Sequence, residues 1–165
     1  TLGGKGKVII LEGTQGAQTA IDRKRAIDDV LKKNSGIQVL ASQTAEYQRA
    51  KAMQVMENLL QTHAQVDAVL ACNDEMALGA VEALDAAKRL ATTKVSGFDA
   101  NKDALKAVLE GRILVTCDQG PERQASDALQ ALFDKLNGKT PSKRIVTKAT
   151  LVTKDNVDQY KARMQ

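Results

Sequence analysis

Residues 66–80, VDAVLACNDEMALGA, join an apolar segment directly to a capped helix. The first part, residues 66–72, is almost entirely apolar, which is typical of a strand that is covered on both faces of a parallel sheet. Asn73 is suited to cap the helix that follows, and Asp74 and Glu75 place negative charge in its first turn, where the helix dipole favours it. The stretch therefore predicts the strand-to-helix connection from which parallel α/β sheets are built.

The same alternation continues on both sides of this stretch. Four further apolar or β-branched runs are expected to be strands, and they lie at residues 8–11, 37–41, 94–98 and 113–116. The segments between the runs carry apolar residues at helical spacing, and the second of these helices is expected over residues 47–63. Strands that alternate with helices in this way indicate βαβ units. The sequence therefore predicts an α/β fold with a doubly wound parallel sheet.

The pattern changes after Gln119. Pro121 suits the first turn of another helix, which Gly138 ends. One face of that helix is apolar and consists of Ala125, Leu129, Leu132 and Leu136. Residues 145–153 are rich in β-branched side chains and are expected to include one more strand, and a short terminal helix is expected from about Asn156.

Composition narrows the class of protein. The 165 residues carry a formal net charge of +4, and the basic residues are scattered without interleaved aromatic ones, so no nucleic-acid partner is expected. There is no apolar run of about 18 residues that would span a membrane. Cys72, Cys117 and His63 form no metal-ligand pattern. An intervening strand is expected to keep the two cysteines ~9–10 Å apart, too far for a disulfide.

Polar side chains follow three successive strands of the expected sheet. They are an amide at Asn73, a carboxylate at Asp99 and a second amide at Gln119, and Phe98 adds an aromatic ring. Ligands of open parallel sheets bind beyond the carboxyl ends of the strands. Sugar hydroxyls need such donors and acceptors, and the C–H face of a sugar ring packs on an aromatic surface. Taken one at a time, Asn73 is better explained as only a helix cap and Asp99 as only the first residue of a loop. Taken together on adjacent strand ends, the three polar residues favour a carbohydrate site.

No arrangement of residues predicts chemistry on that ligand. His63 lies late in a helix, away from the strand ends, and there is no nucleophile elbow, phosphate-binding loop or metal-ligand spacing. Residues 13–16, GTQG, lack the third glycine of a dinucleotide fingerprint and are explained by a tight turn. The sequence therefore predicts a binding protein that is not an enzyme and has no cofactor.

Residues 71–80, ACNDEMALGA, resemble the "NDEMALGA" segment of the ribose-binding-protein group of periplasmic sugar-binding proteins. The resemblance extends in order to residues 54–60 (QVMENLL), 95–99 (VSGFD) and 116–121 (TCDQGP), and it covers nearly the whole chain. It implies a periplasmic protein whose two lobes close over a sugar or polyol. It also implies a partner, the membrane permease of an ABC transporter.

The resemblance implies roles for individual residues. Asn73 and Asp99 stand at hydrogen-bonding positions, Phe98 lines the pocket, and Gln119 lies at the end of the hinge-side strand. Tyr47 stands where the family often has a stacking phenylalanine. The residues at the strand ends are the same ones that the sheet pattern selects.

Ile21 is a departure from the family pattern. The ribose-type pattern places a sugar-binding arginine at this position, and Arg23 matches a second basic residue whose role is more structural. Ile21 lies off the core stripe of its helix, so it is expected to face the cleft and to contact the ligand. Loss of a charge-assisted donor there favours a different monosaccharide, a deoxy sugar or a sugar alcohol over ribose itself.

The resemblance also implies a domain organisation. Residues 1–119 are expected to form the second, C-terminal lobe, and residues 120–165 a crossing helix, a strand and a tail that pack partly on a first lobe. In the family that first lobe precedes the position of Thr1. Without it, the apolar face of the helix would be exposed, and a dimer through that face is the expected alternative cover.

Two other functions share this fold. One is the effector-binding core of a sugar-responsive transcription repressor, in which the DNA-binding helices lie outside the core. The other is a small flavodoxin-like enzyme or signalling domain, which the missing phosphate loop disfavours. The residues of the matching motifs favour the sugar-binding proteins of transport over both.

Overall fold

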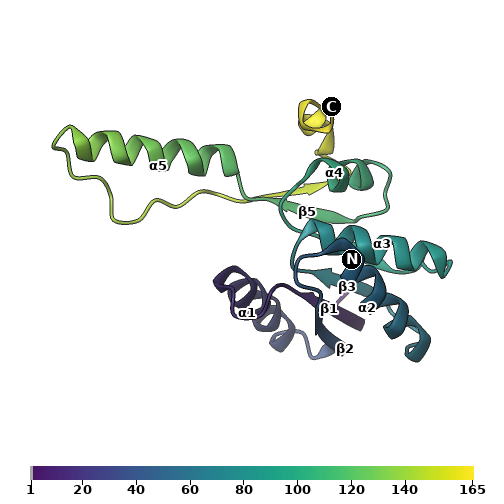
Figure 1. Cartoon of the computed structure of the whole chain (residues 1–165). Coiled ribbons are helices and arrows are strands. Elements are labelled where there is room, and N and C mark those ends of the chain that lie inside the picture. Colours follow the sequence, from purple (N-terminus) through teal and green to yellow (C-terminus); the bar gives the residue numbers. More distant parts are fainter. Residues whose placement is uncertain (1) are drawn as a thin grey trace.

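The computed structural model describes residues 2–165, and its strands form one six-stranded sheet in the order β2-β1-β3-β4-β5-β6 (Figure 1). The strands are β1 (Lys5–Glu12), β2 (Gly36–Thr44), β3 (Ala68–Ala71), β4 (Lys94–Ser96), β5 (Val115–Asp118) and β6 (Thr150–Thr153). Neighbours are parallel from β2 to β5, whereas β6 pairs antiparallel with β5. The predicted doubly wound α/β fold is confirmed, and an antiparallel edge strand is added to it.

The helices divide between the two faces of the sheet. They are α1 (Gln18–Lys32), α2 (Arg49–Thr62), α3 (Asp74–Ala86), α4 (Lys102–Leu109), α5 (Pro121–Leu136) and the 3-10 helix η1 (Val157–Met164). The chain steps from β1 to β2 in one direction along the sheet and from β2 onward in the other. Right-handed crossovers therefore place α1 on the opposite face from α2, α3 and α4, and Figure 1 shows α1 across the strands from α2 and α3.

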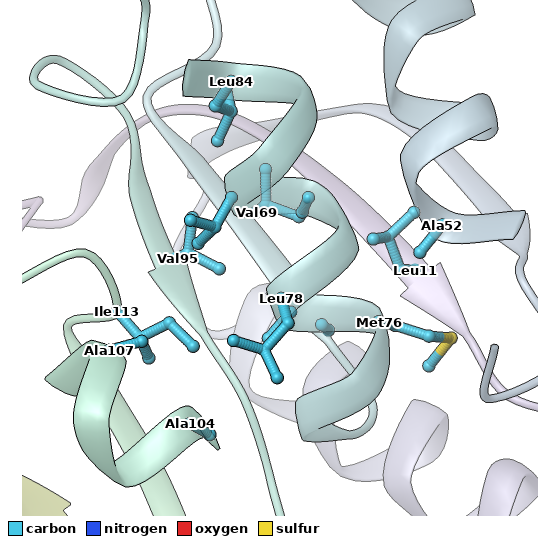
Figure 2. Packing of buried hydrophobic residues seen from close by; sticks show 14 of the residues in the cluster. Leu11, Ala52, Val69, Met76, Leu78, Leu84, Val95, Ala104, Ala107 and Ile113 are labelled. Carbon is cyan, nitrogen blue, oxygen red and sulfur yellow. The ribbon is translucent and has the colours of Figure 1, made fainter. Parts of the chain in front are cut away.

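The main core lies between the sheet and helices α2, α3 and α4, which cover one face of it (Figure 2). Helix α3 is buried on almost every side because its sequence is apolar around most of its circumference. Its Met76 and Leu84 are fully buried beside Val69 of β3 and Val95 of β4. This core fixes the carboxyl ends of β3 and β4 relative to the start of α3.

Gly79 allows α3 to approach α2 closely. A Cβ atom at Gly79 would lie 2.2 Å from the carbonyl oxygen of Arg49 and 3.0 Å from the Cβ of Ala52. Real Cβ atoms do not come so close to a backbone oxygen, so the spacing of the two helices depends on the missing side chain. The family-like "ALGA" segment is thus explained by packing at this glycine.

Helix α5 and the segment that follows it extend away from the sheet (Figure 1). None of the α5 side chains is buried, and Leu129 and Leu136 of the predicted apolar face are 56% and 73% exposed. The strand expected within residues 145–153 forms only over Thr150–Thr153. The tail then returns to the body, where Val157 of η1 is fully buried and η1 packs on α4. Of the helices in residues 2–165, none has the length and apolar character needed to cross a bilayer.

Candidate functional site

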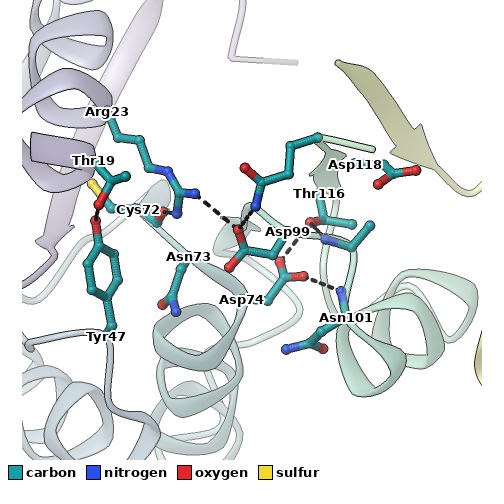
Figure 3. Close-up of polar contacts among 12 residues, drawn as sticks. Thr19, Arg23, Tyr47, Cys72, Asn73, Asp74, Asp99, Asn101, Thr116 and Asp118 are labelled. Carbon is teal, nitrogen blue, oxygen red and sulfur yellow. Dashed lines mark hydrogen bonds and ion pairs between the residues drawn. The ribbon is translucent and has the colours of Figure 1, made fainter. Parts of the chain in front are cut away.

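Two of the predicted side chains meet directly where the parallel strands end (Figure 3). Asp99 follows β4, and Gln119 follows β5, its neighbour in the sheet. The Nε2 of Gln119 donates a hydrogen bond to Oδ1 of Asp99 at 2.9 Å. The sheet pattern therefore brings an amide and a carboxylate together at one edge, as the sequence predicts.

Arg23 of α1 lies at the centre of this edge. Its Nη2 donates to Oδ1 of Asp99 at 3.1 Å, and its Nη1 donates to the carbonyl oxygen of Cys72 at 2.7 Å. Its guanidinium carbon lies 4.1 Å from the centroid of the Phe98 ring and 5.9 Å from that of Tyr47. We call Arg23, Tyr47, Phe98, Asp99 and Gln119 the Arg23 cluster.

The central position of Arg23 was not predicted from the sequence, because the family pattern implies a more structural role for this residue. A signal was present, because Arg23 lies one helical turn after Thr19 near the start of α1 and faces the strand ends. A half-buried carboxylate such as Asp99 also needs a cation nearby, and Arg23 is the cation that pairs with it.

The ring of Tyr47 packs closely against Gly13. A Cβ atom at Gly13 would lie 2.1 Å from Cζ of the Tyr47 ring, so the ring occupies the space that a side chain at Gly13 would fill. The Tyr47 hydroxyl is 3.3 Å from Oγ1 of Thr19. Glu46 and Tyr47 have positive φ angles of 54° and 62°, and α2 therefore begins at Arg49 and not at Tyr47 as the periodicity predicts.

Asn73 and Ile21 have surroundings that differ from those of Asp99. The Oδ1 of Asn73 accepts a hydrogen bond from the backbone N–H of Met76 at 3.0 Å, so Asn73 caps α3 and is only 8% exposed. Ile21 is 45% exposed and lines a separate hollow of about 360 Å³ with Arg25 and Asp28. Ile21 lies about 200° around α1 from Arg23. The structure thus groups Tyr47, Phe98, Asp99 and Gln119 around Arg23 and leaves Asn73 beside them as a cap. Ile21 lies on the other side of α1, in a hollow that also includes Gly13 after the carboxyl end of β1.

Two carboxyl groups near the strand ends are partly or fully removed from water. Burial raises the pKa of Asp99, and the charge of Arg23 acts in the opposite direction. Burial also raises the pKa of Asp74, whose side chain is fully buried, although hydrogen bonds from Thr116 and Asn101 oppose the shift. Hydrogen bonds at such sites are electrostatically stronger than in water.

We expect the stability of the wild type relative to Asp74→Asn to decrease as the pH rises from about 4 to about 7. The native pKa of Asp74 lies above the ordinary value of 3.8, so its contribution to stability is present at low pH and is lost as the pH rises through the native pKa. Urea unfolding at both pH values measures this change.

Asp67→Asn provides a control of opposite sign. The backbone N–H of Lys7 lowers the pKa of Asp67 below its ordinary value of 3.8, so its contribution is lost as the pH falls below about 4, and a third measurement at about pH 3 detects it. Equal pH dependence of the wild type and Asp74→Asn would contradict the burial of a titrating Asp74.

Within residues 2–165, no group of three His, Cys, Asp or Glu side chains is placed to hold an ion. Cys72 and Cys117 are free thiols at the ends of β3 and β5, and β4 lies between those strands, as predicted.

Known proteins resemble the chain over most of its length. The family described as "Periplasmic binding protein domain" matches residues 1–140. The ribose import binding protein of Bacillus subtilis (strain 168) is 40% identical over 151 residues, which cover 91% of this chain and 48% of the relative. The xylitol-binding protein of Mycolicibacterium smegmatis is 38% identical over 158 residues, which cover 95% of this chain and 45% of the relative.

A solved structure shows the same fold. It is that of an ABC transporter periplasmic solute binding protein from Actinobacillus succinogenes 130z with bound D-allose. It matches with a TM-score of 0.93 and 30% identity, and the match covers 96% of this chain and 56% of that one. The chain spans about half the length of the curated relatives it matches. It therefore belongs to the periplasmic binding protein family and is similar to the family's ribose-binding members, as its sequence indicates.

Proposed function

We propose that this chain is the second lobe of the solute-binding component of an ABC-type sugar importer. In this proposal the Arg23 cluster binds one side of a monosaccharide or sugar alcohol, a first lobe binds the other side, and no reaction follows. The observation that carries the proposal is the contact of Asp99 with both Arg23 and Gln119 at the carboxyl ends of the strands. Ligands of open parallel sheets bind at this edge.

The cluster offers complementary groups to a polyol. Arg23 and Gln119 both donate to Oδ1 of Asp99, which leaves Oδ2 as an acceptor for a ligand hydroxyl. The cap made by Oδ1 of Asn73 leaves its amide nitrogen as a donor. The rings of Phe98 and Tyr47 supply apolar surface for the C–H face of the ligand.

We propose that the ligand differs from ribose at the edge that faces α1. The two relatives are named as a ribose import binding protein and a xylitol-binding protein, and the related structure contains D-allose. Ile21 lines a hollow with Gly13 after the carboxyl end of β1 and offers no hydrogen bond there, so a ligand that relies on an arginine at this position loses a charge-assisted contact. The binding experiments below therefore include a sugar alcohol and a hexose as well as ribose.

Helix α5 and the segment that follows it extend from the sheet (Figure 1), as expected for a part of the chain that contacts a second lobe. We propose that residues 1–119 form this lobe together with β6 and η1, which pack on it, and that the apolar face of α5 packs on the first lobe. Support comes from the exposure of that face, including Leu132 at 52% and Leu136 at 73%. A dimer through the same face is the alternative, and sedimentation of the two-lobed protein distinguishes them, because packing on the first lobe predicts a monomer.

A thermal-shift screen of the two-lobed protein with D-ribose, xylitol and D-allose tests the proposed function. A ligand that binds only the folded state raises the unfolding free energy, by about 2.7 kcal/mol at one hundred times its Kd. We expect at least one of the three to raise the unfolding midpoint, and the shift to be strongly reduced in Arg23→Ala. A folded protein whose midpoint none of them changes would contradict the proposal.

A further inference from the structure

We propose that Asp74 is a positioning residue that holds Asp99 in place for the ligand, although its own side chain is fully buried. This inference rests on the sugar-binding role proposed above. Its basis is one network of hydrogen bonds between the carboxylate of Asp74 and the turn that carries Asp99 (Figure 3).

The turn that carries Asp99 has an unfavourable backbone conformation. The φ angles of Asp99 and Ala100 are 117° and 53°, in a region that residues other than glycine seldom adopt. Such conformations persist only where surrounding groups hold them. The direction of the Asp99 carboxylate therefore depends on contacts outside the turn.

Asp74 binds the backbone on both sides of this turn. Before it, the N–H of Asp74 donates to the carbonyl oxygen of Phe98 at 2.8 Å. After it, Oδ2 of Asp74 accepts from the N–H of Asn101 at 2.8 Å. The two residues that flank the turn are thus fixed to one residue of α3.

Thr116 extends the same network to the middle of the turn. Its Oγ1 donates to Oδ1 of Asp74 at 2.6 Å and accepts from the N–H of Ala100 at 3.2 Å. Thr116 is fully buried in β5, three residues before Gln119. The network therefore links the strand ends that present Asp99 and Gln119.

Gly97 provides the space that the Asp74 carboxylate occupies. A Cβ atom at Gly97 would lie 2.2 Å from Oδ1 of Asp74. The φ angle of Gly97 is not positive, so a glycine is needed there for space and not for backbone conformation. The sequence thus keeps a position open for this one carboxylate.

The test is calorimetric titration of the two-lobed protein and its Asp74→Ala variant with D-ribose, xylitol and D-allose. Asp74→Ala leaves the Asn101 N–H and the Thr116 hydroxyl without their acceptors and releases the turn. We expect Kd to rise about tenfold while the number of sites per folded protein stays the same. Thr116→Val removes the same link by an isosteric change and is expected to act in the same direction, whereas Thr116→Ser keeps the hydroxyl and restores affinity.

Thr93→Val is the matched control. Thr93 is also buried, and its Oγ1 donates to the carbonyl oxygen of Val66 at 2.8 Å, but it lies at the opposite, amino end of the strands. We expect Thr93→Val to lower the unfolding midpoint and to leave Kd unchanged. This separates loss of stability from loss of position.

The outcomes distinguish the inference from the function on which it rests. If Asp74→Ala reduces the number of active sites and leaves Kd unchanged, Asp74 only stabilises the fold, and the inference is wrong. If Asp74→Ala does not fold, an unchanged Kd in Thr116→Val has the same consequence. A wild-type protein that binds none of the three sugars contradicts the proposed function, and the positioning role is then wrong as well.

Discussion

Replacing Asp99 by alanine is expected to weaken sugar binding by the two-lobed protein about 10- to 150-fold, the equivalent of one charged hydrogen bond worth ~1.5–3 kcal/mol. The change removes the acceptor for a ligand hydroxyl. It also leaves the guanidinium of Arg23, whose side chain is only 18% exposed, without its carboxylate partner. Isothermal titration calorimetry with the sugar that gives the largest thermal shift measures the loss of affinity.

Asp85→Ala is the control for this prediction. Asp85 also forms an ion pair, with Arg112 at 3.1 Å, but it lies near the C-terminal end of α3, away from the strand ends that carry the cluster. Its removal is expected to leave Kd unchanged, because an exposed ion pair contributes little. Equal affinity of the wild type and Asp99→Ala would remove Asp99 from the binding site.

Gly79→Ala is expected to lower the free energy of unfolding by about 2–3 kcal/mol. The added Cβ would lie 2.2 Å from a backbone oxygen of α2, and relief of that clash requires the two helices to separate within the core. Alanine favours a helix over glycine by only ~1 kcal/mol, which does not offset the clash. Urea unfolding followed by far-UV circular dichroism measures the difference.

Glu82→Ala, one turn further along α3, is the matched control. Glu82 is exposed, and its ion pair with Arg49 is long, at 3.9 Å. We expect a change within about 0.5 kcal/mol. If Gly79→Ala is as stable as the wild type, the close contact of α2 and α3 is not a requirement of the fold.

The sequence predicts the parallel part of the sheet because burial on both faces leaves a simple signal. Residues 8–11 are at most 1% exposed, and only apolar side chains occupy them. Consecutive strands usually lie side by side in such sheets, so the ends of β3, β4 and β5 are expected to lie together, which makes Asp99 and Gln119 neighbours.

The other features of the site depend on tertiary contacts, which the periodicity of the sequence does not predict. The length of the Arg23 side chain lets it reach Asp99 across the edge of the sheet, 76 positions along the chain. The positive φ angles at Tyr47 and Asp99 are held by tertiary neighbours. The contact of Ile21 with the ligand stays a prediction, because it rests on helix geometry and Ile21 lines a hollow on the other side of α1 from Arg23.

A crystal structure of the two-lobed protein with its bound sugar or polyol would show whether the Arg23 cluster contacts the ligand. We expect ligand hydroxyl oxygens within about 3 Å of the Asp99 carboxylate and of the Gln119 amide, with the rings of Phe98 or Tyr47 against ligand carbons. A ligand held elsewhere, with Asp99 bonded only to Arg23 and Gln119, would contradict this expectation.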